Sequence, residues 1–166
     1  MHVAMILTRV LVIALIAGAF VTISAPASSH HSFSMYDQST TRTMSGKLTQ
    51  FISGSNHAQL LFQVLDASGR PEMKDGMPVQ WGVEMASTRQ MSRPGVTPDR
   101  YPQGTVLTVR VYPLRPAFVH SRAGRNFGAL AGVLITCGHA MPKGGCTREA
   151  GHVFPVASVD FGADSP

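Results

Sequence analysis

The sequence has few charges, two cysteines and one tryptophan, and these scarcities narrow the classes of protein it can be. Charged residues make up 14% of the 166 residues, and the net charge of +5 is a mild basic bias rather than that of a polyelectrolyte. The chain has no glycine-rich phosphate loop, no Gly-x-Ser-x-Gly motif and no Cys-x-x-Cys pair. No second carboxylate stands at a spacing that suggests acid–base partnership with Glu84. We therefore expect the protein not to be an enzyme.

The one long apolar run stands at the beginning of the chain. Arg9 and the amino terminus are the only positive charges of residues 1–9, and residues 10–23 form an apolar run of 14 residues, which is short for a membrane span. Ala25-Pro26-Ala27 follows as a small-x-small cleavage site. This order predicts a signal peptide over residues 1–27 and a periplasmic or secreted mature protein without a transmembrane span. An uncleaved segment that acts as an N-terminal anchor is the alternative, and nucleic acid is not an expected partner in either compartment.

The rest of the chain is rich in short alternating runs that are typical of β-strands. We expect strands at residues 44–51, 57–66, 79–85, 105–112 and 127–136, a further short one at 153–159, and one helix at 86–92. This order predicts an all-β protein, a small OB-like, partly open barrel of five to six strands with one short helix. Residues 28–43 are expected to form an N-terminal arm, 44–136 the barrel, and 137–166 a disulfide loop and C-terminal tail. The residues expected in the core are Trp81, Val83, Leu107, Val109, Val111, Leu130 and Val133.

The two cysteines, Cys137 and Cys146, enclose eight residues that include several glycines. An even cysteine count in an oxidising compartment predicts a disulfide. The alternative is a zinc site that adds His139 and His152, but this spacing matches no common zinc module.

The start of the expected mature chain, His30-His31-Ser32-Phe33, resembles that of the exported bacterial domain-of-unknown-function family 6152. In this family a Thr/Ser-Gly-x-Val/Leu strand, a Trp-x-Asn-Pro-His motif and a Trp-x-x-Glu strand follow in order. Over residues 30–136 the matching positions are Ser45, Gly46, Leu48, Phe51, His57, Trp81, Glu84, Arg93, Gly95, Pro102, Gly104, Pro113, Arg115 and Gly128-Ala129-Leu130. The resemblance implies a periplasmic barrel of unsettled activity. The two other family tryptophans are Ser53 and Val96 here, and Asn-Pro is Ser55-Asn56, so any ligand surface those residues form is partly lost.

Two adjacent histidines near the expected mature terminus suggest metal binding. Cleavage after Ala27 leaves Ser28-Ser29-His30, whose amine, two amides and imidazole form a square-planar set suited to Cu(II) or Ni(II). Cleavage one or two residues later gives a similar chelate through His31 or through a terminal His30. His57 could complete a site for Cu(II), Ni(II) or Zn(II) if the arm folds back. The alternative is that histidines on a flexible arm bind metal only adventitiously.

A basic segment offers a second kind of function. Four arginines and His120 gather after residue 109, where they could recognise an anionic glycolipid or another envelope protein, or could form only a solvated basic edge. The arginines are Arg110, Arg115, Arg122 and Arg125. Glu84 is expected to pair with Arg93 or Arg115 in support of the barrel.

From the histidines and the basic segment together we expect a periplasmic binding module for a metal ion or small ligand. A structural or interaction protein of the envelope is the alternative, and an envelope hydrolase comes third.

Overall fold

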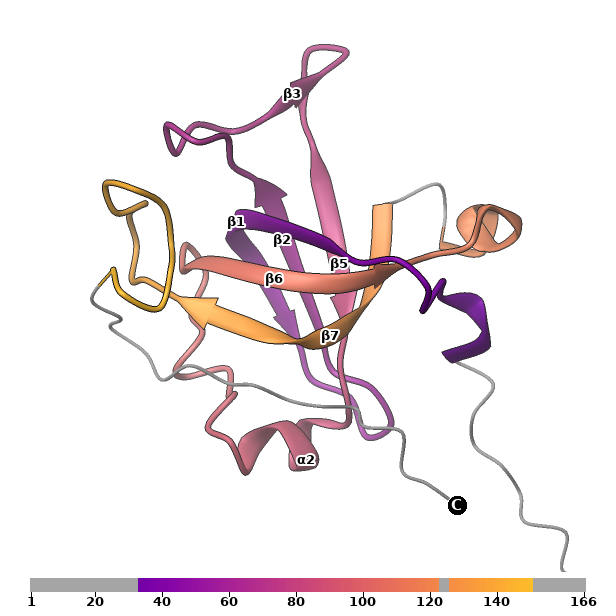
Figure 1. Ribbon diagram of the computed structural model, residues 1–166. Helices are drawn as coiled ribbons and strands as arrows, with labels where there is room; N and C mark the ends of the chain where they lie inside the picture. The colour runs from indigo at the N-terminus through magenta and orange to yellow at the C-terminus, as the bar shows by residue number, and fades with distance from the viewer. Residues whose placement is uncertain (1–32, 123–125, 151–166) are drawn as a thin grey trace, which may run out of the picture. The chain divides into compact units, whose positions relative to one another are not determined.

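The computed structural model describes residues 33–122 and 126–150. The expected signal peptide, His30, His31 and the expected strand at 153–159 lie outside these residues. Five strands form a closed barrel in the order β1-β2-β5-β7-β6 (Figure 1). They are β1 (Arg42–Ile52), β2 (Gln59–Val64), β5 (Gln80–Glu84), β6 (Val106–Pro113) and β7 (Asn126–Thr136). Only the β5–β7 pair in this barrel is parallel.

This architecture confirms the small all-β barrel with one short helix. The barrel is closed rather than partly open, because β1 pairs with β6 through residues 42–47 and with β2 through residues 46–52. Gly46 lies where the two pairings overlap, opposite Val64 on one side and Leu107 on the other. A β-bulge between Leu48 and Gln50 then bends β1 further around the barrel.

The connections contain short elements. The helix α2 (Thr88–Ser92) lies within the expected residues and begins with a capping box between Ser87 and Gln90. A hairpin of β3 (Met73–Lys74) and β4 (Met77–Pro78) occupies an expected loop, and its Asp75-Gly76 turn has φ values of 51° and 77°, as a type I′ turn requires. The 3-10 helices η1 (Phe33–Met35) and η2 (Pro116–Arg122) complete the elements. Within the described residues no helix is long and apolar enough to span a membrane.

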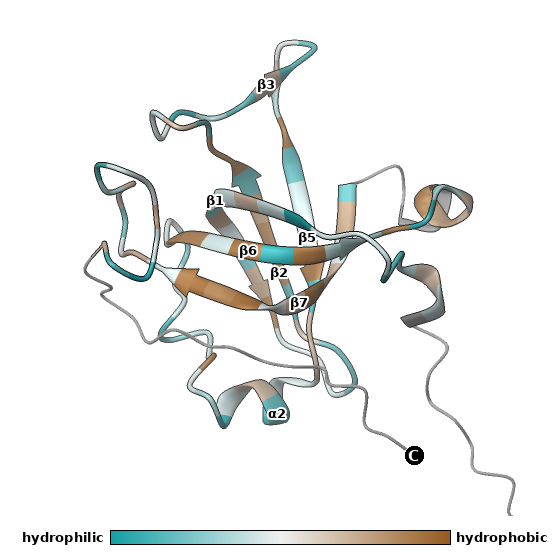
Figure 2. Cartoon of the chain, in the orientation of Figure 1, coloured by the Kyte–Doolittle hydropathy of each residue, from teal (hydrophilic) through white to brown (hydrophobic). Residues whose placement is uncertain are grey.

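The barrel interior holds the main hydrophobic core, and Figure 2 shows the hydrophobic residues concentrated in the strands. Six of the seven residues expected in the core are buried, but the expectation for Val133 is wrong because it is only half-buried. The cause is the spacing, because Val133 lies three residues after Leu130 in β7 and strand alternation therefore places the two side chains on opposite faces. Leu130 and Leu134 belong to the core inside the barrel, whereas Val133 and Ile135 pack outside it. The irregularity in the pairing leaves two residues of β7, Ala131 and Gly132, without partners and so does not change this alternation.

Cys137 and Cys146 form a disulfide, as expected. Two oxidised sulfurs cannot serve as thiolate ligands, so the alternative zinc site is excluded. The loop between the cysteines continues the end of the barrel, because Cys137 N donates to Val106 O and Val106 N donates to Gly138 O. The disulfide packs with Leu65, Val106 and Ile135 in a second hydrophobic cluster outside the barrel.

Replacing both cysteines by serine will lower the free energy of unfolding by about 2–3 kcal/mol, because the unfolded chain regains the freedom of a loop of about ten residues. Urea unfolding of the oxidised wild type and of the Cys137→Ser, Cys146→Ser variant measures the difference. Wild type treated with reductant serves as the control and will match the variant. Equal unfolding midpoints for all three proteins would contradict this stabilising role.

Gly46→Ala will destabilise the barrel by about 1–3 kcal/mol, since the added methyl group overlaps the ring of Phe62 and presses on the Gln63 carbonyl. Thermal unfolding measures the effect, with Lys47→Ala on the neighbouring exposed position as the matched control. A Gly46→Ala protein as stable as the control would show that β1 can close the barrel without this close approach.

Candidate functional site

The chain segment before β1 is fixed to the end of β6. Asp37 N donates to Pro113 O at 2.8 Å, and Arg115 N donates to Met35 O at 2.9 Å. The Arg115 Nε adds a hydrogen bond to Tyr36 O at 3.2 Å. Tyr36 is fully buried by this pairing. The described end of the expected arm over residues 28–43 packs on the barrel and enters β1 at Arg42.

Tyr36 belongs to a third hydrophobic cluster, which lies on the outer face of the barrel. It packs there with Phe127 and Ala129 of β7. The ring of Phe127 lies against Gly82 of β5 so closely that a Cβ at that position would overlap it. A glycine in β5 thus lets an aromatic ring cover the strand, and the buried outer face extends to the next outward residue of β5, Glu84.

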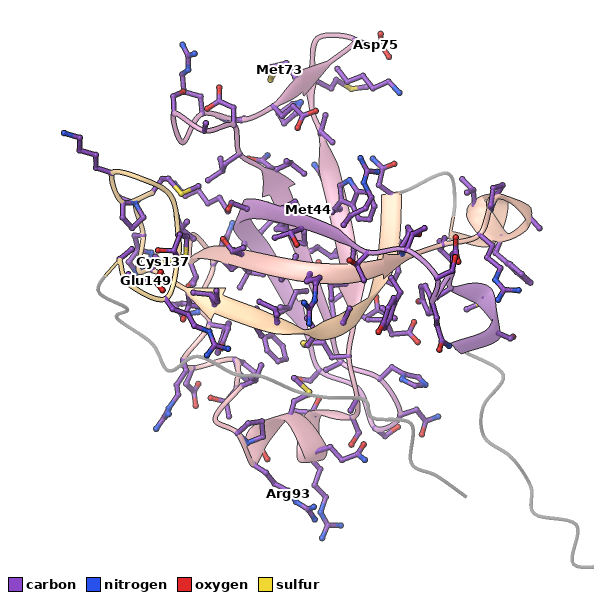
Figure 3. All side chains as sticks on the ribbon, in the orientation of Figure 1. Met44, Met73, Asp75, Arg93, Cys137 and Glu149 are labelled. Atoms are coloured by element: carbon purple, nitrogen blue, oxygen red, sulfur yellow. A yellow bond between two sulfur atoms is a disulfide. The ribbon has the colours of Figure 1, made fainter. Side chains whose placement is uncertain are left out.

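Glu84 is 5% exposed and is contacted from two sides. The Tyr36 hydroxyl donates to its Oε2 at 3.1 Å, and the Nδ1 of His57 lies 3.6 Å from its Oε1. We refer to these three residues as the Tyr36–Glu84–His57 cluster. The expected pairing of Glu84 with Arg93 or Arg115 is wrong, because Arg93 points away from the barrel below α2 (Figure 3) and Arg115 binds the Tyr36 backbone instead.

A tight turn places His57 at this cluster. Gly54 approaches the His57 carbonyl so closely that a Cβ there would overlap it. Gly54 is itself held by α2, since its N donates to Thr88 Oγ1 at 2.8 Å and its O accepts from Thr88 N at 3.0 Å. The imidazole Nδ1 lies 3.2 Å from the Met85 carbonyl, and the side chain is 35% exposed. His57 is therefore held by one ring nitrogen and reaches solvent.

The cluster supplies one imidazole and one carboxylate from the described residues. No group of three histidine, cysteine or acidic side chains within residues 33–122 and 126–150 could hold a metal ion. A metal at His57 would therefore need ligands from elsewhere, and the two other predicted ligands, His30 and His31, lie outside the described residues. No motif or spacing in the sequence placed Tyr36 or Glu84 near His57. Glu84 and His57 are both positions of the family resemblance, but nothing in the sequence showed that they meet.

The arginines of the predicted anion-binding segment are only partly described. Arg110 is exposed on β6 and its Nε donates to Ala131 O at 2.8 Å. Arg115 is exposed just beyond the end of β6. Arg125 and the side chain of Arg122 lie outside the described part of the chain. The two described guanidinium groups each bind a backbone carbonyl of this chain.

A separate cavity of about 320 Å³ lies at the other end of β2, beside Val64 and the disulfide loop. Asp66 and Glu72 line it together with Met141. Hydrogen bonds from the Ser68 hydroxyl and the Arg70 backbone lower the pKa of the exposed Asp66 carboxyl. Asp66 Oδ1 accepts from Ser68 and Arg70 and so organises its own turn. The cavity is thus distinct from the Tyr36–Glu84–His57 cluster, which lies at the start of β2.

Comparison with known proteins gives a family but no activity. No curated protein and no solved structure matches this chain. The family of unknown function DUF6152 matches residues 19–123, which include Tyr36, His57 and Glu84. Because this match covers more than half of the sequence, the chain belongs to the family of unknown function DUF6152.

Proposed function

We propose that the protein is an exported, periplasmic or secreted binding module that holds a divalent metal ion at the end of its N-terminal segment. Cu(II) is the best candidate, with Ni(II) and Zn(II) bound less tightly, through the terminal nitrogens, His30 or His31, and His57. The supporting observation is the docking of Tyr36, whose hydroxyl and His57 contact the same carboxylate.

The docking of Tyr36 supports the proposal because it limits how far the two histidines can be from His57. His31 is five positions before Tyr36 in the sequence, and five extended residues span at most about 17 Å. The sequence therefore keeps His31 within about 17 Å of Tyr36. A short connection between ligands raises the effective concentration of one at the other and so strengthens chelation.

The chemistry of the expected mature terminus suits a divalent ion. An amine, two deprotonated amides and an imidazole provide four nitrogens in one plane, which Cu(II) and Ni(II) prefer. An imidazole at His57 is a further nitrogen ligand that Zn(II) also accepts. Export is supported by the apolar run before Ala25-Pro26-Ala27 and by the disulfide, which is typical of oxidising compartments.

Recognition of an envelope protein or an anionic glycolipid is the alternative function. It would use the basic segment from Arg110 to Arg125. It has less support, because Arg110 and Arg115 each commit their Nε to a backbone carbonyl and so contribute to holding the fold. We therefore place the metal hypothesis first.

A His30→Ala, His31→Ala change will remove most Cu(II) binding from the mature, untagged protein while leaving the barrel folded. Neither residue belongs to the described core, so the change removes ligands and leaves the side chains of that core unchanged. Isothermal titration with Cu(II) measures the affinity, and thermal unfolding of the metal-free proteins checks the fold.

His139→Ala is the matched control, because His139 is an exposed histidine in the disulfide loop. It will bind Cu(II) as wild type does. If the double variant binds Cu(II) as tightly as wild type, the metal function is wrong, and binding to anionic lipid vesicles becomes the next measurement.

A further inference from the structure

We propose that the cavity between the barrel and the disulfide loop binds a small organic cation, an ammonium group on a short apolar chain. This site is independent of the proposed metal function and lies at the other end of β2 from His57. Four parts of the described chain line it, namely β1 at residues 43–45, the end of β2 and its turn at residues 64–67, Glu72, and the disulfide loop.

Contacts between the disulfide loop and the barrel hold the walls of the cavity in place. Thr108 Oγ1 donates to the Cys146 carbonyl at 2.8 Å. On the loop, Met141 lies so close to Gly69 that a Cβ on this glycine would overlap it. The loop therefore contacts both β6 and the turn after β2. The volume between them, about 320 Å³, is within the range of small-molecule sites.

The Ser45 hydroxyl offers a ligand in this cavity only a hydrogen-bond acceptor. Its Oγ lies 2.7 Å from Thr108 Oγ1. A threonine hydroxyl has one proton, and Thr108 donates it to the Cys146 carbonyl. Ser45 must therefore donate its own proton to Thr108. The lone pairs of Ser45 Oγ then remain to accept a hydrogen bond, which suits a ligand that donates.

Two carboxylates add charged acceptors to the cavity. Asp66 and Glu72 line it, and none of the described residues that line it is basic. Hydrogen bonds from the Ser68 hydroxyl and the Arg70 backbone lower the pKa of Asp66, so this carboxylate keeps its charge in mildly acidic solution. Arg70 Nε lies 3.6 Å from Asp66 Oδ2, but the Arg70 side chain is 80% exposed and its Nε donates to Ser68. The charge of the cavity therefore favours a cation.

Apolar side chains and the number of carboxylates decide which kind of cation fits. Val64 is buried, and Met44 (Figure 3) and Met141 are half-buried. The flexible thioether side chains adapt to an apolar group of irregular shape. Within residues 33–122 and 126–150 no group of three histidine, cysteine or acidic side chains could hold a metal ion. An alkylammonium ion matches both the acceptors and the apolar wall.

Titration with pentylamine at neutral pH, followed by the amide signals of the mature protein in NMR spectra, tests the proposal. Pentylamine will shift the signals of residues that line the cavity, because it carries an ammonium group on an alkyl chain. Pentan-1-ol, its neutral counterpart, will bind about 10-fold more weakly, because it brings no charge to the two carboxylates. Equal binding of the two probes, or no shifts at the cavity, would overturn the proposal.

Variants of the acceptors locate the ammonium group. Glu72→Gln will lower the pentylamine affinity by about 3- to 5-fold, and Glu72→Gln with Asp66→Asn by about 10-fold, since each change removes one negative charge. Ser45→Ala will lower it by about 3-fold through loss of the uncharged acceptor.

Asp75→Asn is the matched control for charge. It removes one negative charge from the turn of the β3–β4 hairpin, which does not line the cavity, and asparagine tolerates the positive φ of this position. This variant will bind pentylamine as wild type does. An equal loss for Asp75→Asn and Glu72→Gln would show that affinity follows net charge alone, and the site would be wrong.

Met141→Lys tests whether the disulfide loop is a wall of the site. It places a positive charge on the loop and will abolish pentylamine binding, while thermal unfolding checks that the protein is folded. Undiminished binding would overturn the assignment of the site to this cavity. The His30→Ala, His31→Ala variant will bind pentylamine as wild type does, so the cation site and the Cu(II) function succeed or fail separately. Loss of pentylamine from that variant would place the amine elsewhere and overturn the proposal.

Discussion

Closure of the barrel by β1 is the constraint on which the rest of the structure depends. This strand pairs with β6 through its first half and with β2 through its second half, and the two ladders overlap at Gly46 and Lys47. At Gly46 the backbone lies so close to the ring of Phe62, a residue of the core, that a Cβ there would overlap it. Any side chain at this point would compete with the core for the same space, so closure and core packing are one requirement rather than two.

A closed barrel this small buries only one face of each strand, so the outer faces need separate cover. The disulfide packs against one region of the outer face, where it contacts Leu65, Val106 and Ile135. The N-terminal segment covers another, where Tyr36 packs beside Phe127. In OB-type barrels the outer face of the second and third strands is a ligand-binding surface. Here the third strand of the barrel is β5, and the polar cluster lies at its end, against the segment that covers that face.

Much of the fold could be predicted from the sequence because its strands alternate. Each predicted barrel strand lies within about two residues of the observed one, and the single helix begins at a recognisable Ser-x-x-Gln cap. Alternation did not identify Val133 as outward-facing, because the run of residues 127–136 is apolar on both faces and shows no alternating pattern. It also missed β3 and β4, since two-residue strands have no period. The Asp75-Gly76 pair was the signal that could have revealed that hairpin.

The candidate site could be predicted only in part, for a reason that lies in how it is built. His57 could be identified because a histidine at the start of a strand is a possible metal ligand. Its partners could not, because they stand at positions that the alternation pattern predicts to face solvent. Glu84 points outward from β5, yet it is buried, and the Tyr36 hydroxyl donates to its carboxylate. Tyr36 stands in a polar, aperiodic segment where nothing local indicates docking. Residues 35–37 pair through their backbone with residues 113–115, and this pairing buries Tyr36 beside Glu84. In this buried position the Glu84 carboxylate faces His57. The chemistry of the site therefore depends on tertiary contacts that bury Glu84 and Tyr36, and the alternation pattern of a single sequence does not indicate such contacts.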